Sequence, residues 1–136
     1  MAWTHSLIRI AAHEIDTLKK RLAGIAERRA HIEMKLIVLD AEAEAETERA
    51  RTDAEAGWYL IGFRQGWTLR RDHALAELND CALEERGCRD ALAAAFEAQK
   101  KVEQVAESHR LLAVKEEGRR ETAAMDDLAL RKAVGR

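Results

Sequence analysis

Apolar residues in the first third of the chain recur at alternating intervals of three and four positions. This heptad spacing is typical of helices that pack against a partner along a narrow face, which we call the seam, with charged residues outside it. Arg29 is the one polar residue in the row. The pattern predicts a first helix over about residues 6–50. Its predicted seam residues are Ile8, Ile15, Leu18, Leu22, Ile25, Ile32, Leu36, Leu39 and Ala43.

The end of this helix has a different character, because acidic residues alternate with alanines from Asp40 to Glu55 and large apolar residues are absent. Alanine and glutamate favour helix, so the segment is expected to remain helical. Because it has little apolar surface to bury, we expect a solvated helix end. The alternative is an acidic patch that binds a basic partner.

A chain reversal is predicted between about residues 45 and 57. Thr52 and Glu55 have the spacing of a capping box, in which each side chain accepts a hydrogen bond from the backbone amide of the other residue. A capping box marks the start of a helix. A second helix is therefore predicted over about residues 58–130.

Residues 57–67 hold four of the six aromatic residues and three of the seven glycines. Tyr59, Phe63 and Trp67 follow at intervals of four, which places them on one face of the opening turns of the second helix. One interpretation is that these aromatics, with Trp58, seal the end of the hairpin. The other is that exposed aromatics anchor a protein partner. The two interpretations are compatible.

The second helix has a weaker seam than the first, because Glu85, Gln99 and His109 interrupt it. Two helices joined by a short reversal predict an all-α fold, a long antiparallel two-helix coiled-coil hairpin that forms a single domain over residues 1–136. The second helix is longer, so its C-terminal end is expected to extend past the first. Its predicted seam residues are Leu75, Leu78, Cys81, Cys88, Leu92, Phe96, Val102, Val105, Ala106, Leu112, Ala113, Ala123 and Leu130.

Composition supports this fold and excludes several functions. The 136 residues are 35% charged and 4% aromatic, with 26 alanines and no proline, which is typical of long unbroken helices. The formal charge of −2 lacks the basic excess of proteins that bind duplex nucleic acid. No apolar run approaches the ~20 residues that span a bilayer, and no secretory signal is recognisable. We therefore expect an intracellular protein without nucleic-acid binding or direct membrane insertion.

Candidate catalytic chemistry is sparse. None of the five histidines has a glutamate three positions before it, as a di-iron helical bundle would require. No phosphate-binding loop sequence is present. Cys81 and Cys88 lie about 10.5 Å apart along a helix, too far for an internal disulfide, and are expected to be small buried residues. The sequence thus predicts no catalytic, cofactor-binding or metal site.

Residues 119–131 read Arg-Arg-Glu-Thr-Ala-Ala-Met-Asp-Asp-Leu-Ala-Leu-Arg. This segment resembles the closing signature of the FliJ-like flagellar type III export proteins, a basic–acidic run that leads into Met/Leu-Asp-Glu, a hydrophobic residue, Ala, any residue and Arg. The chain length, the N-terminal heptad helix and a Tyr-x-x-x-Phe element at Tyr59 and Phe63 are also similar to that family. The resemblance covers the whole chain, and the C-terminal signature is its most specific part.

The resemblance implies a function without catalysis. Members of this family are antiparallel coiled coils that look like the rotor stalk of rotary ATPases. Their paired termini bind the hexameric flagellar export ATPase, their middle contacts the cytoplasmic domain of the export gate, and they escort export chaperones. The implied location is the cytoplasm, peripheral to the inner membrane at the flagellar base.

The resemblance also implies two contact surfaces, carried over by position. The first surface, which would contact the export gate, departs from the family pattern at Trp67, Arg70 and Ala74. The implied gate surface consists of Tyr59, Phe63, Trp67, Arg70 and Ala74. The implied ATPase surface consists of Leu7, Met125, Asp126, Leu128 and Arg131.

A different class of function also fits the pattern. The chain would then be a generic cytoplasmic coiled-coil scaffold, with two copies forming a four-helix bundle. Glu85, Gln99 and His109, which interrupt the second seam, would be satisfied across such a dimer.

Overall fold

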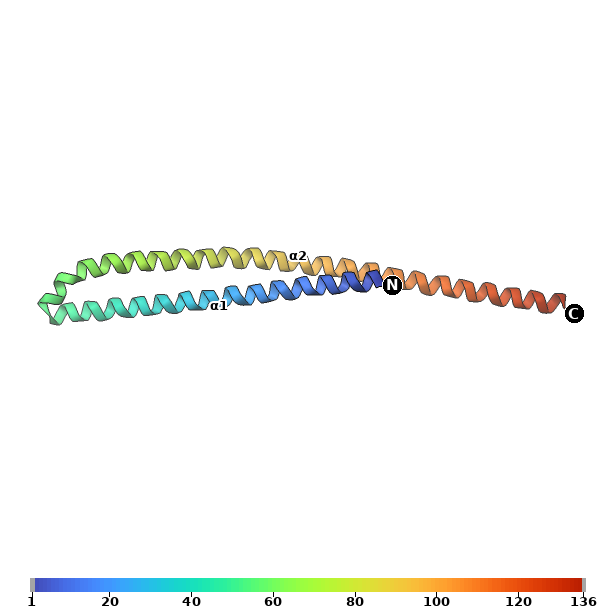
Figure 1. Ribbon diagram of the computed structural model, residues 1–136, viewed down its shortest axis with the longest axis horizontal. Helices are drawn as coiled ribbons and strands as arrows, with labels where there is room; N and C mark the ends of the chain where they lie inside the picture. Colours follow the sequence, from blue (N-terminus) through green and yellow to red (C-terminus); the bar gives the residue numbers. More distant parts are fainter. Residues whose placement is uncertain (1, 136) are drawn as a thin grey trace. The chain divides into compact units, whose positions relative to one another are not determined.

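The computed structural model of the protein describes residues 2–135, and the regular secondary structure of this part is entirely α-helical. Helix α1 spans Ala2–Thr52 and helix α2 spans Ala54–Val134, and the two pack against each other (Figure 1). The prediction of an all-α fold with two packed helices is confirmed. Neither helix within the described residues combines the length and the apolar character needed to cross a membrane.

Asp53 alone separates the two helices. Its N–H donates to the Arg49 carbonyl at 3.0 Å, and its own carbonyl accepts from the Gly57 N–H at 3.4 Å. Its side-chain Oδ1 accepts from the Glu55 N–H at 3.0 Å, so Asp53 is the N-cap of α2. The predicted capping box is wrong, because Thr52 still belongs to α1 and its hydroxyl donates to the Arg49 carbonyl at 3.2 Å.

The chain divides into two compact units, and both helices contribute to each of them. The hairpin unit, residues 16–93, contains the turn at Asp53. The terminal unit combines residues 1–15 with residues 94–136, of which 2–15 and 94–135 are described. In both units, a segment of α1 packs against a segment of α2.

The core of the hairpin unit is a narrow row of side chains between α1 and α2. Ile25 and Ile32 of α1 are buried together with Ala74, Cys81 and Cys88 of α2. Large side chains of one helix thus face small side chains of the other, which allows dense packing between only two helices. The two cysteines are free and buried, as predicted. The partly buried residues around this core are Leu18, Leu22, Leu36 and Leu78.

The predicted seam of α1 is confirmed, since all nine of its residues are buried or half-buried. The row continues toward the N-terminus through the buried Ala11 and Thr4. The interval of three and four positions therefore holds along almost the whole of α1. A single local period was sufficient to identify the buried face of this helix.

The predicted seam of α2 is only partly correct. Leu75 and Phe96 are each 43% exposed, and the neighbouring alanines, Ala74 and Ala95, occupy the buried positions instead. The prediction favoured large side chains, whereas the close contact with α1 accommodates small ones. The correctly predicted residues are Leu78, Cys81, Cys88, Leu92, Val102 and Ala106. The remaining predicted residues, which are exposed, are Val105, Leu112, Ala113, Ala123 and Leu130.

Two polar residues that interrupt the seams, Arg29 of α1 and Glu85 of α2, form an ion pair with each other at 3.1 Å. Glu85 also accepts hydrogen bonds from Arg89, the shorter at 2.9 Å. The Arg89 hydrogen bond, helped by the Arg29 charge, keeps the pKa of the Glu85 carboxyl below its ordinary value against the opposing effect of partial burial. Arg28 and Glu84 join the helices in the same way at 2.6 Å. Because a shift of one helix along the other would separate these charges, polar pairs across an apolar seam favour one alignment of α1 against α2.

The acidic end of α1 is more involved in packing than the sequence suggested. Ala43 and Ala50 are half-buried, and Asp40 forms an ion pair with Arg71 at 3.3 Å. The prediction of a solvated helix end is therefore wrong for one face of this segment. Alanines continue the seam there because α2 lies close enough for a methyl group to fill the space.

In the terminal unit, the first turns of α1 lie against α2, and α2 then continues toward its C-terminus without α1 beside it (Figure 1). Ala11 and Ala95 are buried, and Ile8, Val102 and Ala106 are half-buried. Among residues 110–135 every residue except the half-buried one at position 116 is exposed.

Candidate partner-binding surfaces

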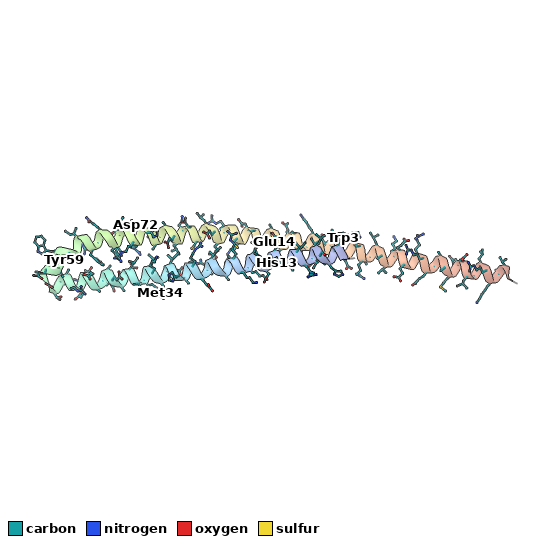
Figure 2. The ribbon with its side chains drawn as sticks, viewed as in Figure 1. Trp3, His13, Glu14, Met34, Tyr59 and Asp72 are labelled. Atoms are coloured by element: carbon teal, nitrogen blue, oxygen red, sulfur yellow. The ribbon has the colours of Figure 1, made fainter. Side chains whose placement is uncertain are left out.

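The aromatic residues of the implied gate surface lie on the opening turns of α2 in the hairpin unit. Trp58 and Tyr59 are exposed, and Figure 2 shows Tyr59 at the turn with its ring directed outward. Phe63 and Trp67 are half-buried. The prediction that Tyr59, Phe63 and Trp67 share one face is wrong, because eight residues rotate a helix by about 80° beyond two full turns. Only Phe63 and Trp67 lie on the side that packs.

Trp67 connects α2 to α1. Its indole Nε1–H donates to the Leu39 carbonyl at 2.6 Å. The guanidinium carbon of Arg71 lies 5.6 Å from the centroid of the Trp67 ring, within range of a cation–π interaction. Arg71 in turn pairs with Asp40 of α1. Trp67 therefore has a structural role in the helix contact, whatever else it binds.

The other two residues of this surface have opposite environments. Arg70 is exposed and its guanidinium lies 3.5 Å from a carboxylate oxygen of Glu42. Ala74 is completely buried in the core of the hairpin unit. A partner can reach Arg70 directly, whereas Ala74 presents no surface while the two helices remain packed.

Two open grooves border Trp67 and Arg70. The first has a volume of about 430 Å³ and is lined by apolar and acidic side chains. The second has a volume of about 250 Å³ and is lined by charged and aliphatic side chains. The first is lined by Ile37, Asp40, Ala41, Ala43, Glu44 and Trp67. The second is lined by Lys35, Val38, Leu39, Glu42, Arg70 and His73.

The residues of the implied ATPase surface all belong to the terminal unit, but they do not form one cluster. Met125, Asp126 and Leu128 are exposed on α2, and Arg131 pairs with Asp127 at 3.3 Å. Leu7 lies on α1. Its neighbours Thr4, His5 and Ile8 line a groove together with residues of α2 that are far from Met125. These residues are Glu103, Ala106, Glu107, His109, Arg110 and Ala113. Residues 114–124 separate the two sets, a distance of about 18 Å along a helix.

The groove beside the first turn of α1 has a volume of about 470 Å³, and His109 in its lining makes an aromatic contact that the sequence did not predict. The rings of Trp3 and His109 meet edge to face, with centroids 4.9 Å apart and an interplanar angle of 88°. Figure 2 shows Trp3 at the N-terminal end of α1, where this helix lies beside α2. The sequence signal was available, since the seam continued backwards from Ile8 reaches Thr4, next to Trp3.

The ion pairs of the described part of the terminal unit join side chains of the same helix. Arg110 binds Glu107 at 2.7 Å and Arg119 binds Glu116 at 2.8 Å. These hydrogen bonds lower the pKa of both carboxyl groups and raise the pKa of both guanidinium groups. Within residues 2–135, no group of three or more His, Cys, Asp or Glu side chains is arranged to hold a metal ion.

Comparison with known proteins gives one clear result. The chain is 52% identical over 131 residues to the flagellar FliJ protein of Caulobacter vibrioides strain NA1000 / CB15N, covering 96% of this chain and 94% of the relative. The same values hold for the flagellar FliJ protein of C. vibrioides strain ATCC 19089 / CIP 103742 / CB 15. No protein-family model and no solved structure matches the chain. The chain therefore belongs to the FliJ family of flagellar export proteins, as its C-terminal signature predicted.

Proposed function

We propose that this flagellar export component is a non-enzymatic stalk that binds the hexameric export ATPase through its terminal unit and the export gate through its hairpin unit. The observation that carries the proposal is the 52% identity to flagellar FliJ proteins over 96% of the chain. The protein would work in the cytoplasm, peripheral to the inner membrane at the flagellar base. Export chaperones are further partners in this proposal.

The stalk in this proposal is an antiparallel coiled coil. The heptad spacing of the α1 seam and the small residues opposite it support such an arrangement. Contacts between the helices join Arg28 to Glu84 and Asp40 to Arg71. A later residue of α1 thus pairs with an earlier residue of α2, as expected for helices that run in opposite directions.

The gate contact would use the exposed aromatic and basic groups at the start of α2. Tyr59 and Arg70 are accessible, and Phe63 and Trp67 border them with half-buried rings. Exposed aromatic side chains and arginine are the residues most often found at the centre of protein interfaces. Ala74 would act indirectly in this contact, because its small size lets α2 approach α1 beneath Arg70.

The ATPase contact would use the exposed face of α2 near Met125, Asp126, Leu128 and Arg131, with Leu7 as a separate point of contact. A bound stalk changes the equilibrium among the states of the ATPase subunits only if it binds those states with different affinities. A helix with exposed apolar and charged groups offers such contacts without any catalytic group of its own.

The alternative function, a scaffold that dimerises as a four-helix bundle, has less support. It was suggested by the polar residues that interrupt the α2 seam. Glu85 pairs with Arg29 and His109 contacts Trp3, so both have partners within one chain. A second hairpin is therefore not needed to satisfy them.

Turnover and hexamer formation of the purified export ATPase test the main proposal. The wild-type chain at micromolar concentration is expected to increase both, and Met125→Glu is expected to raise the concentration required by at least about tenfold, since it places a charge in an apolar contact. Leu130→Glu is the matched control, because Leu130 is similarly exposed but lies on another face. If the wild-type chain changes neither quantity, the proposal is wrong.

Capture by the cytoplasmic domain of the gate tests the second contact. Tyr59→Ala is expected to weaken capture, whereas Leu83→Ala, which alters another exposed side chain of α2, is expected to leave it unchanged. Equal binding by both variants would remove Tyr59 from the gate surface.

A further inference from the structure

The C-terminal part of α2 carries an exposed apolar row that the helix pair does not use. Leu111, Val114, Met125 and Leu128 are all exposed. They follow one another at intervals of three and four once Gly118 and Glu121 are included, so they occupy one face of the helix. We call these six residues the tail stripe.

The tail stripe faces away from α1. The residues of α2 that pack against the first turns of α1 include the half-buried Val102, Ala106 and His109. Leu111 follows Val102 by nine residues, which is a rotation of about 180° along a helix. The stripe therefore plays no part in packing within the chain, and α1 does not cover it.

The six positions of the tail stripe have the same spacing whether they are counted from the N-terminal or the C-terminal end of the stripe. Starting from its centre, between residues 119 and 120, Gly118 and Glu121 come first, then Val114 and Met125, then Leu111 and Leu128. We propose that two copies of the chain pair through this stripe as antiparallel helices related by a two-fold axis. Leu111 then packs against Leu128 of the second copy, and Val114 packs against Met125 of the second copy. Because of the two-fold axis, each of these contacts occurs twice in the dimer.

The centre of the stripe suits this pairing. A Cβ atom at Gly118 would meet nothing within 4 Å, so the glycine leaves a gap in the surface. The aliphatic part of Glu121 from the second copy can lie over this gap with its carboxylate directed outward. Neither Glu121 nor the nearby Lys115 has an ion-pair partner among the described residues, and in the dimer they approach each other across the interface.

The ends of the stripe also complement each other. Glu107 and Lys132 continue the same face and are equally far from its centre. In the antiparallel dimer, each Glu107, which also pairs with Arg110 of its own helix, therefore comes close to Lys132 of the second copy. Lys132 forms no ion pair within the described part of the chain, so its charge is available. Opposite charges at both ends favour this register.

Two comparisons favour this arrangement over others. A parallel dimer would place Glu121 beside Glu121 of the second copy, and like charges at such positions destabilise helix pairing. The other exposed apolar residues of this part of α2, Leu112 and Leu130, lie on a face that Arg119 and Asp126 interrupt. That face lacks both a continuous apolar row and the symmetric spacing.

The dimer would cover Met125 and Leu128. If the proposed ATPase contact holds, self-pairing and ATPase binding therefore exclude each other, and the dimer is a resting form of the free protein. This consequence rests on the proposed function. The pairing itself does not, and its test needs no ATPase.

Sedimentation of the full chain alone tests the pairing. We expect a reversible monomer–dimer equilibrium in which Leu111→Glu or Leu128→Glu raises the dissociation constant by at least about tenfold, since each places two buried charges in the dimer. Leu112→Glu and Leu130→Glu are matched controls, because these leucines are 62% and 67% exposed compared with 54% and 58% for Leu111 and Leu128. Circular dichroism verifies that all four variants keep the wild-type helix content.

Disulfide formation tests the orientation. Val114→Cys and Met125→Cys are prepared separately and then mixed under mild oxidation, with the wild-type chain as control because Cys81 and Cys88 are buried. We expect a rapid cross-link between the two different variants and little cross-linking of either variant alone. The proposal is overturned if cross-links form mainly between identical variants, if the wild-type chain stays monomeric up to about 1 mM, or if the control leucine variants weaken the dimer equally.

Discussion

Residues 74–88 and residues 110–135 of α2 are both rich in charged and small residues, and both have apolar residues at helical spacing. In the first segment Ala74, Cys81 and Cys88 are buried against the isoleucines of α1. In the second segment larger residues such as Met125 and Leu128 are exposed. The size and spacing of apolar residues therefore do not decide burial. A facing row on another helix decides it.

The two segments also differ in their ion pairs, because only the first segment forms ion pairs with α1. Glu85 in the hairpin unit pairs with Arg29 of the other helix. In the terminal unit, Arg119 and Arg131 pair with Glu116 and Asp127 on their own helix. Pairs within a helix contribute only about 0.2–0.5 kcal/mol each to helix stability. Pairs between helices also fix the register, so we expect stability to be concentrated in the hairpin unit.

Truncation of a buried isoleucine should show this difference most strongly. Ile32, which is 3% exposed, contacts the core of the hairpin unit, and Ile32→Ala is expected to lower the free energy of unfolding by about 2–5 kcal/mol. Leu130→Ala, which alters an exposed residue of the terminal unit, is expected to change it by less than about 0.5 kcal/mol. Urea unfolding followed by circular dichroism measures both. Equal losses would show that the terminal unit has a core of its own.

A smaller effect is expected from the indole of Trp67. Trp67→Phe keeps an aromatic ring beside Arg71 but removes the hydrogen bond to the Leu39 carbonyl, which should lower the free energy of unfolding by about 0.5–1.5 kcal/mol. The control is Trp58→Phe, because Trp58 is exposed at the same end of α2. If both variants are as stable as the wild-type chain, Trp67 does not join the helices as described.

The smallest effect is expected from the titration of Glu85. Its pKa in the folded chain is below the ordinary value of 4.5, so its contribution to stability is complete above pH 4.5 and is lost as the pH falls through the lower, folded-state pKa. Glu85→Gln should therefore be less stable than the wild-type chain at neutral pH, and this difference should shrink in acid. Thermal unfolding at pH 7 and pH 3 tests this. A difference that is the same at both pH values would exclude a stabilising role of the ionised carboxylate.

The family assignment and the buried face of α1 could both be predicted before the structure was known. The C-terminal signature around Met125 and Asp126 indicated the FliJ family, and curated relatives confirmed it. The nine predicted seam residues of α1 are all buried or half-buried. These predictions succeeded because each depends on a local pattern, either a short motif or a regular period along a single helix.

The surfaces were less predictable. Tyr59 and Trp67 were expected on one face, but Tyr59 is exposed and Trp67 is bound to the Leu39 carbonyl. Ala74 was expected on a contact surface and is completely buried. Whether a residue of α2 faces α1 or solvent depends on which face of α2 packs against α1. No local pattern in the sequence of α2 identifies that face.

The sequence by itself determined that the chain forms long helices, because it lacks proline and is rich in alanine and charged residues. It also determined the seam of α1, since large apolar residues mark that face clearly. Only the tertiary structure decided that Asp53 caps α2, that Arg29 pairs with Glu85, and that Ala74 instead of Leu75 fills the core. Helix formation depends on residues a few positions apart, whereas the fit between two helices depends on side chains distant in the sequence.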